Sequence, residues 1–181
     1  MTDDQQILSM YREEGRQEPA FNLLVRKYGE RLYWHLRKLV CSHEDADDLL
    51  QSTLIKVWKG LPEFREQSKL YTWLYRIATN EALSFLKKKR AAAFLSLSNY
   101  SAALENKLQS DPYFNGDRLQ TALYRAILKL PDKQRAVFNL RYFQELKYEE
   151  IAEILGTSVG ALKASYHHAY LKIKQNLEQL D

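Results

Sequence analysis

Between Lys147 and Lys163 the chain has the residue types that a helix-turn-helix needs, at the spacing it needs. Gly156 can adopt the positive φ that ends a first helix, and Ser158 can cap the helix that follows. Apolar residues at helical spacing give the first helix one buried stripe, formed by Ile151, Ile154 and Leu155. We therefore expect a DNA-contacting module here, with an ordinary helical hairpin as the alternative for so short a motif.

The second helix of this module would present a polar outer face to the major groove of duplex DNA. Its buried stripe continues through Leu162, Tyr166 and Ala169. Hydroxyl, imidazole and ammonium groups on the opposite face can hydrogen-bond to phosphate oxygens and base edges. The candidate residues for this contact are Ser158, Gly160, Lys163, Ser165, His167 and His168.

An acidic surface is expected on a helix that begins near residue 44 and ends close to Pro62. Asp45 and Asp48 should face away from its apolar stripe, with Gln51 on the flank. Carboxylates placed in this way can dock on a basic partner surface. The alternative is that they only stabilise the first turn of the helix by interacting with its macrodipole.

The next helix ends in a basic cluster, and one of its faces combines basic and amide groups. Arg76, Thr79 and Asn80 are expected on this solvent-exposed face, and the aromatic Phe64 lies close to them in sequence. Such a mixture suits unpaired bases as well as duplex DNA, because a displaced base needs a stacking wall and hydrogen-bond partners. The alternative is a plain amphipathic helix with Trp73 and Tyr75 in the core. The candidate residues for DNA contact are Phe64, Arg65, Ser68, Arg76, Asn80 and Lys87.

Several classes of chemistry have no supporting pattern in the chain. There is no glycine-rich phosphate loop, no nucleophile elbow and no cysteine paired with a suitable base. His35 and His43 have no further histidine or cysteine that completes a metal-ligand set. We therefore predict a protein that is not an enzyme, has no catalytic residues and binds neither a metal nor a cofactor.

Composition adds only coarse limits on function and location. The chain has 181 residues with 27 basic and 23 acidic side chains, and a net charge of +4 is a mild indication of nucleic-acid binding. The single cysteine, Cys41, cannot form an internal disulfide and is expected to be buried or half-buried. No apolar run approaches the length of a membrane span, so we expect a cytoplasmic protein without membrane insertion.

The pattern of apolar residues predicts an all-α protein with two small helical domains. Residues 1–91 should form a helical bundle, and residues 117–181 should form the domain that contains the helix-turn-helix. Residues 92–116, with one basic and two acidic side chains and a turn at their end, are predicted to be a linker in which some helix persists. Two buried stripes are expected from leucine spacing: Leu50, Leu54, Val57, Trp58 and Leu61 in the first domain, and Leu119, Leu123, Ile127 and Leu130 in the second.

Taken in order, these blocks resemble bacterial RNA polymerase sigma factors of the extracytoplasmic-function type, within the sigma-70 family, over nearly the whole chain. The acidic helix, Asp45 to Gln51 with Thr53 and Trp58, is similar to region 2.2. Phe64, Arg65, Ser68, the segment 72–78 and Asn80 resemble the promoter-melting and −10-reading part of region 2. The segments 130–143 and 147–163 resemble regions 4.1 and 4.2.

The resemblance implies a σ2-like and a σ4-like domain, without a σ3 domain between them. By this resemblance, Asp45, Asp48 and Gln51 would bind the clamp helices of the polymerase β′ subunit, and the second domain would read the −35 promoter element and meet the β flap. An anti-sigma factor is a further partner that the family allows. One departure concerns the recognition helix, where Ser165, His168 and Tyr170 stand in place of the arginines usual in the family.

Two rival classes remain open at this point. A stand-alone helix-turn-helix regulator would bind duplex DNA without polymerase, as a symmetric dimer on a palindrome. A purely structural helical adaptor would leave the polar face around Asn80 without a role. Co-purification with core polymerase, at one copy per complex, separates the sigma factor from the dimeric regulator.

Overall fold

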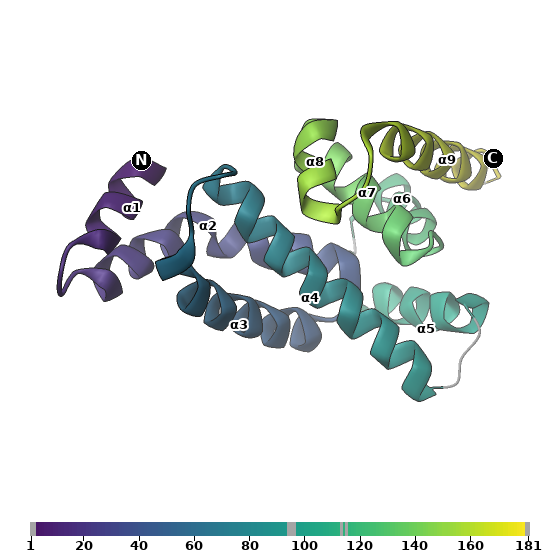
Figure 1. The fold of residues 1–181 in the computed structure, drawn as a ribbon. Helices are drawn as coiled ribbons and strands as arrows, with labels where there is room; N and C mark the ends of the chain where they lie inside the picture. The colour runs from purple at the N-terminus through teal and green to yellow at the C-terminus, as the bar shows by residue number, and fades with distance from the viewer. Residues whose placement is uncertain (1–2, 94–96, 113, 115, 180–181) are drawn as a thin grey trace.

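The protein is described by a computed structural model that covers residues 3–93, 97–112, 114 and 116–179, and this part of the chain contains helices but no strand (Figure 1). The predicted all-α class is therefore confirmed. Every helix in these ranges is too short or too polar to cross a lipid bilayer. The helices are α1 (Asp4–Arg12), α2 (Gln17–Val40), α3 (His43–Gly60), the short 3-10 helix η1 (Leu61–Glu63), α4 (Leu70–Ala93), α5 (Leu97–Ser110), α6 (Arg118–Leu128), α7 (Asp132–Tyr142), α8 (Tyr148–Leu155) and α9 (Val159–Glu178).

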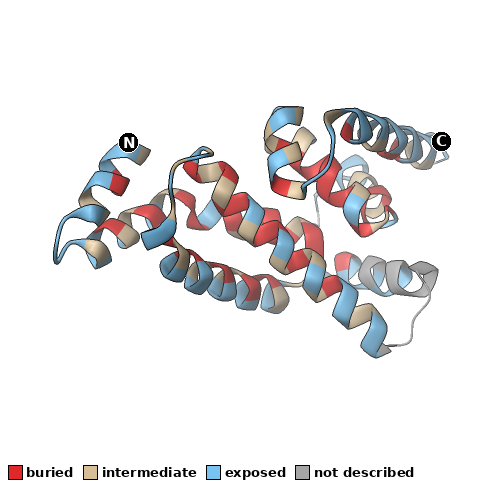
Figure 2. Cartoon of the chain, viewed as in Figure 1, coloured by how far each residue is buried: buried red, intermediate tan, exposed pale blue. Residues whose placement is uncertain are grey.

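The first four helices form a bundle around α2 and α4, the two longest helices (Figure 2). Both have a stripe of fully buried side chains, because apolar residues recur every three or four positions along them. On α2 the stripe includes Leu24, Leu32 and Leu36, and on α4 it includes Leu74 and Ala78. α1 packs on α2, and α3 packs on both α2 and α4.

The buried stripe expected on α3 is only partly confirmed: Val57 and Leu61 are buried as predicted, but the other buried residues of α3 differ from the expected ones. Its buried residues are Ala46, Leu49, Thr53 and Val57, while Leu50 and Leu54 are only half-buried. Trp58 is 40% exposed, so its predicted burial is wrong. Two small side chains, Ala46 and Thr53, face the core, and Trp58 instead lies edge-on against Tyr11 and Phe21 with its outer side uncovered.

The segment 92–116, predicted as a linker, contains α5, and its C-terminal end is attached to the first domain. The buried guanidinium of Arg37 on α2 pairs with Asp111. The same group lies 4.7 Å from the ring centroid of Phe114, which is only 3% exposed. Because Arg37 has no exposed surface, this anchor gives a buried charge an opposite-charge partner as well as holding the segment.

The second domain consists of α6 to α9, with α9 packed on both α6 and α7. Leu119 is 66% exposed, so its predicted place in a buried stripe is wrong. The buried residues of α6 all lie in its last turn, which leaves its first turn outside the core. Ile127 and Leu130 are buried as predicted.

The helix-turn-helix predicted from Lys147 to Lys163 is confirmed as α8 followed by α9. Gly156 has a φ of 64° and ends α8 in the left-handed region. Ser158 Oγ accepts a hydrogen bond from the backbone N–H of Ala161 at 3.2 Å and so caps α9. Gly156 thus ends the first helix and Ser158 caps the second, as their residue types predict.

Candidate nucleic-acid and partner interfaces

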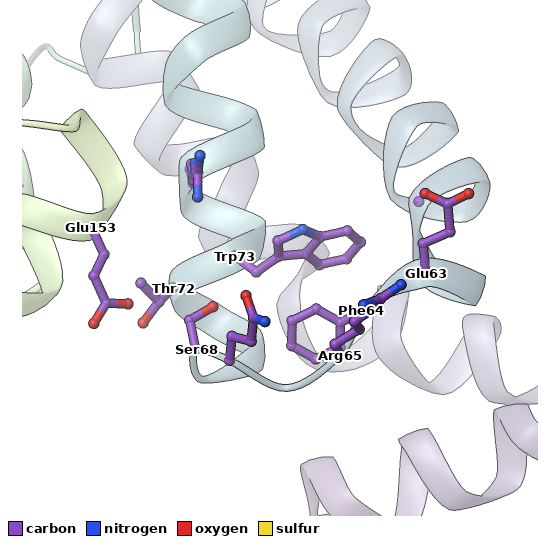
Figure 3. Close-up of a pocket in the computed structure, with 10 residues that line it drawn as sticks. Glu63, Phe64, Arg65, Ser68, Thr72, Trp73 and Glu153 are labelled. Atoms are coloured by element: carbon purple, nitrogen blue, oxygen red, sulfur yellow. The ribbon is translucent and has the colours of Figure 1, made fainter.

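A cleft of about 550 Å³ opens between the loop before α4 and the first turns of that helix (Figure 3). Its aromatic wall is made by Phe64 and Trp73, whose ring centroids are 4.9 Å apart. Polar and charged groups surround this wall, as a site for a base and its phosphates requires. The lining residues are Gly60, Glu63, Phe64, Arg65, Gln67, Ser68, Thr72, Trp73, Arg76 and Glu153.

A glycine at the end of α3 makes room for the aromatic wall. A Cβ atom at Gly60 would lie 3.0 Å from Cζ2 of Trp73, which is closer than ordinary van der Waals contact. The close approach of the Gly60 backbone therefore fixes the position of the indole. Any larger residue here would require Trp73 to shift.

The loop that carries Phe64 and Arg65 is held by the N-terminal helix. Glu66 has a φ of 56°, which is unusual for a residue other than glycine. Its carboxylate accepts a hydrogen bond of 2.9 Å from Gln5 Nε2 and pairs with Arg12, both on α1. The hydrogen bonds from Gln5 and Arg12 hold the pKa of the Glu66 carboxyl below its usual value.

Of the six residues predicted to contact −10 DNA, four lie together in this cleft: Phe64, Arg65, Ser68 and Arg76. Asn80 is exposed but lines a second cleft, of about 580 Å³, that also includes residues of the second domain. Lys87 is exposed further along α4 and lines neither cleft. Their role in DNA binding stays a prediction.

The expected polar face of α4 is interrupted at Thr79. This residue is completely buried, and its Oγ1 lies 2.8 Å from Nε2 of His35 on α2. The expectation that Thr79 faces solvent is therefore wrong. α4 is covered on this side because α2 packs against it, and the Thr79 hydroxyl provides a polar partner for a histidine that has no exposed surface.

The residues on α3 that are predicted to dock on polymerase differ in their exposure and in the contacts they already make. Asp48 and Gln51 are exposed. Asp45 is instead held by Lys89 of α4, with Oδ2 and Nζ 2.7 Å apart, so its expected outward orientation is only partly met. Exposed apolar surface continues this face along the helix, where Ile55 is 55% exposed and Trp58 is 40% exposed. The result is a surface with both acidic and apolar groups.

Most of the residues predicted to read −35 DNA form the open side of α9. Ser158, Gly160, Lys163, His167 and His168 are exposed. Ser165 is half-buried and lines the second cleft. Hydrogen-bond donors are thus spread along one helix face, in the arrangement that groove contacts need.

Several residues that line the first cleft were not predicted from the sequence. Glu153 lines it from α8, far away in sequence, and Figure 3 shows its side chain extending toward Thr72. Gly60 and Gln67 also line it. For Gly60 a signal existed, since a glycine directly before Leu61 and Pro62 marks the end of a helix. Among the residues that the structure describes, no three His, Cys, Asp or Glu side chains are grouped to hold a metal ion.

Comparisons with known proteins agree with the division into two parts. Residues 24–92 match the family described as Sigma-70 region 2, and residues 120–173 match Sigma-70, region 4. The RNA polymerase sigma factor YlaC of Bacillus subtilis is 34% identical over 155 residues, which is 85% of this chain and 90% of the relative. The chain belongs to the RNA polymerase sigma factors. Two extracytoplasmic-function members are also similar. SigW of Bacillus subtilis is 30% identical over 90% of this chain and 91% of its own length. The sigma-E factor of Escherichia coli is 32% identical over 97% of this chain and 95% of its own length.

Solved structures of sigma factors share the fold. The sigma factor RpoE of Bartonella quintana, solved with the anti-sigma factor NepR, gives a TM-score of 0.68 at 23% identity, over 87% of this chain and 96% of that one. CnrH, solved with the cytosolic domain of CnrY, gives a TM-score of 0.68 at 24% identity, over 97% of this chain and 94% of that one. Membership of this family favours transcription initiation over a stand-alone regulator as the function.

Proposed function

We propose that the two domains of this sigma factor divide promoter recognition between them. The domain formed by residues 1–91 would bind core polymerase and the −10 element, and the domain formed by residues 117–181 would bind the −35 element. The observation that carries this proposal is the cleft beside α4, where an aromatic wall and basic side chains suit an unpaired base and its phosphates. The protein would turn over no substrate and would act by binding alone.

Docking on polymerase would use the exposed part of the acidic α3 surface. Asp48 and Gln51 are free to meet a basic partner, and Ile55 and Trp58 beside them offer apolar contact. An interface of this kind combines charge complementarity with a desolvated apolar centre. By the family relationship, the partner surfaces would be the β′ clamp helices for this domain and the β flap for the second domain, and an anti-sigma factor would compete for them.

Charge reversal at Asp48 tests the docking surface. Asp48→Arg places like charges together where the partner is basic, so its affinity for core polymerase should fall on the order of a hundredfold. Glu30→Arg, which makes the same charge change at an exposed position on α2, is the matched control and should bind normally. Wild-type affinity for core polymerase in a folded Asp48→Arg variant would show that this surface is not the docking site.

A further inference from the structure

Two adjacent histidines, His167 and His168, lie on the open side of α9. Both are exposed, and their ring centroids are 6.2 Å apart. Among the residues that the structure describes, neither imidazole forms a hydrogen bond or an ion pair. The ring nitrogens of both residues are therefore available to a partner outside the chain.

Small residues allow α9 to come close to a nucleic-acid backbone. An imidazole is shorter than the side chain of arginine or lysine, so it reaches a phosphate only where the helix itself approaches closely. Gly160, Ala161 and Ala164 are exposed on the turns before the histidines. A Cβ atom at Gly160 would have no neighbour within 4 Å, so no other side chain covers this part of the helix. Close approach is thus sterically possible.

The place of the histidines along α9 favours phosphates over bases. A recognition helix reads base edges with its N-terminal residues. His167 lies about 12 Å along the axis from Val159, the first residue of α9, at a rise of about 1.5 Å per residue. We therefore expect the two rings to meet the phosphates that border the groove, beyond the bases that the first turns contact.

Protonation changes what an imidazole can offer to a phosphate. A neutral ring donates from one nitrogen and accepts with the other, whereas a protonated ring donates from both. Phosphate oxygens accept, and a hydrogen bond between charged partners is roughly twice as strong as a neutral one. Histidine also changes its charge close to neutral pH. Binding of the rings to phosphate would therefore take up protons.

The cations near this face favour binding of DNA and leave the histidines without a counter-charge. Lys163 and Lys172 lie on α9 itself, one turn before His167 and one turn after His168. From α7, the guanidinium of Arg141 lies 4.9 Å from the centroid of the Tyr148 ring, over which the Lys163 ammonium also lies at 5.9 Å. From α6, Lys129 donates to Asn176 of α9 at 3.2 Å.

The carboxylates of the helices that pack against α9 do not supply this counter-charge. α6 has no acidic residue, and Asp132 of α7 is only 8% exposed and pairs with Arg135. On α8, Glu149 is exposed, Glu150 pairs with Lys69 and Glu153 lines the first cleft. Within the described part of the chain, none of these carboxylates forms an ion pair with either histidine. A DNA phosphate would provide the missing negative charge.

We propose that His167 and His168 bind promoter phosphates in their protonated form, so that binding of the polymerase complex to the −35 element strengthens as the pH falls. This inference rests on the proposed function, because it takes the −35 role of α9 from there. It adds a pH dependence that a lysine or an arginine at these two positions would not give, since both stay charged throughout the neutral range.

Two double variants fix the charge of the pair. His167→Gln with His168→Gln keeps hydrogen-bonding groups that stay neutral at every pH, and His167→Arg with His168→Arg keeps a positive charge at every pH. His43→Gln changes an exposed histidine on α3 and is the matched control. His35 is unchanged in all of these proteins, so the effect of its titration on folding cancels in the comparison.

Fluorescence anisotropy with the full-length chain in complex with core polymerase measures the effect. The probe is a labelled promoter duplex that the wild-type complex has selected from a library with a randomised −35 element. Relative to the arginine pair, the wild type and His43→Gln should bind on the order of tenfold more tightly at about pH 6 than at about pH 8. The glutamine pair should bind weakly at both values. The slope of log affinity against log salt concentration should be steeper for the wild type at the lower pH by up to about 1.8, at about 0.9 for each phosphate contact.

The outcomes separate this inference from the proposed function. If the wild type, the glutamine pair and the arginine pair show the same change of affinity with pH while all of them bind the promoter, the proton-linked contact is refuted and the −35 role of α9 stands. A salt slope of the wild type that does not change with pH would also refute the phosphate contact. If scrambling the −35 element leaves the affinity of every protein unchanged, the proposed function of the second domain fails, and the inference fails with it.

Discussion

His35 should make the stability of the fold depend on pH. The imidazole has no exposed surface, lies edge-to-face against Tyr75 with ring centroids 5.1 Å apart, and contacts Thr79. Burial, with a smaller contribution from the charge of Lys38, lowers the pKa of His35 from 6.5 to about 3. The folded protein therefore keeps this ring neutral at acidities where the unfolded chain protonates it.

The direction and size of the effect follow from proton binding. Above about pH 6.5 neither the folded nor the unfolded chain binds a proton at His35, and the titration of this residue lowers the free energy of unfolding by nothing. Between about pH 6.5 and pH 3 only the unfolded chain binds it, so the free energy of unfolding falls as pH falls. At about pH 5 the loss should be about 2 kcal/mol, since each pH unit below the unfolded pKa costs about 1.4 kcal/mol.

Urea unfolding followed by circular dichroism at about pH 7.5 and about pH 5 measures this difference. His35→Gln cannot titrate, so its unfolding free energy should fall by about 2 kcal/mol less than that of the wild type over the same interval. His167→Gln changes an exposed histidine and should keep the wild-type dependence. Equal pH dependence in the wild type and His35→Gln would refute the argument that the buried ring stays neutral.

Two further predictions concern DNA in the polymerase complex. Asn80→Ala should lower permanganate reactivity of thymines across the −10 region without weakening polymerase binding, because it removes a hydrogen-bonding group from an exposed position. Ser84→Ala, one turn further along α4, is the control. Unchanged thymine reactivity in the Asn80→Ala complex would exclude a reading role for Asn80. Lys163→Ala should weaken promoter binding and reduce the slope of log affinity against log salt concentration by about 0.9, as expected for one lost phosphate contact. Lys174→Ala is the control and should change neither quantity. A slope identical to that of the wild type in the Lys163→Ala variant would exclude this contact.

Local features of the fold were predictable because each depends on residues close together in sequence. Gly156 and Ser158 define the turn of the helix-turn-helix by backbone freedom and side-chain capping, neither of which needs information from elsewhere in the chain. The grouping of Phe64 with Arg76 was foreseeable for the same reason, since a short loop joins Phe64 to α4 and Arg76 lies near the start of that helix.

The errors arose where a distant helix decides which side is covered. Trp58 and Leu119 belong to apolar stripes, but no described helix covers their outer sides, and they remain 40% and 66% exposed. Thr79 is polar, yet α2 buries it. The position of Glu153 in the first cleft depends on docking between domains, which helical periodicity does not encode.

The contact between α1 and Glu66 has a thermodynamic consequence for binding. α1 precedes residues 24–92, the part of the chain that matches Sigma-70 region 2. By holding Glu66 in a left-handed conformation, Gln5 and Arg12 make the chain lose the conformational entropy of this loop during folding. A nucleic-acid strand that enters the cleft then meets a preorganised wall, and less of its binding free energy is spent on ordering the protein. If the cleft binds nucleic acid as proposed, the N-terminal helix would contribute to affinity without itself lining the cleft.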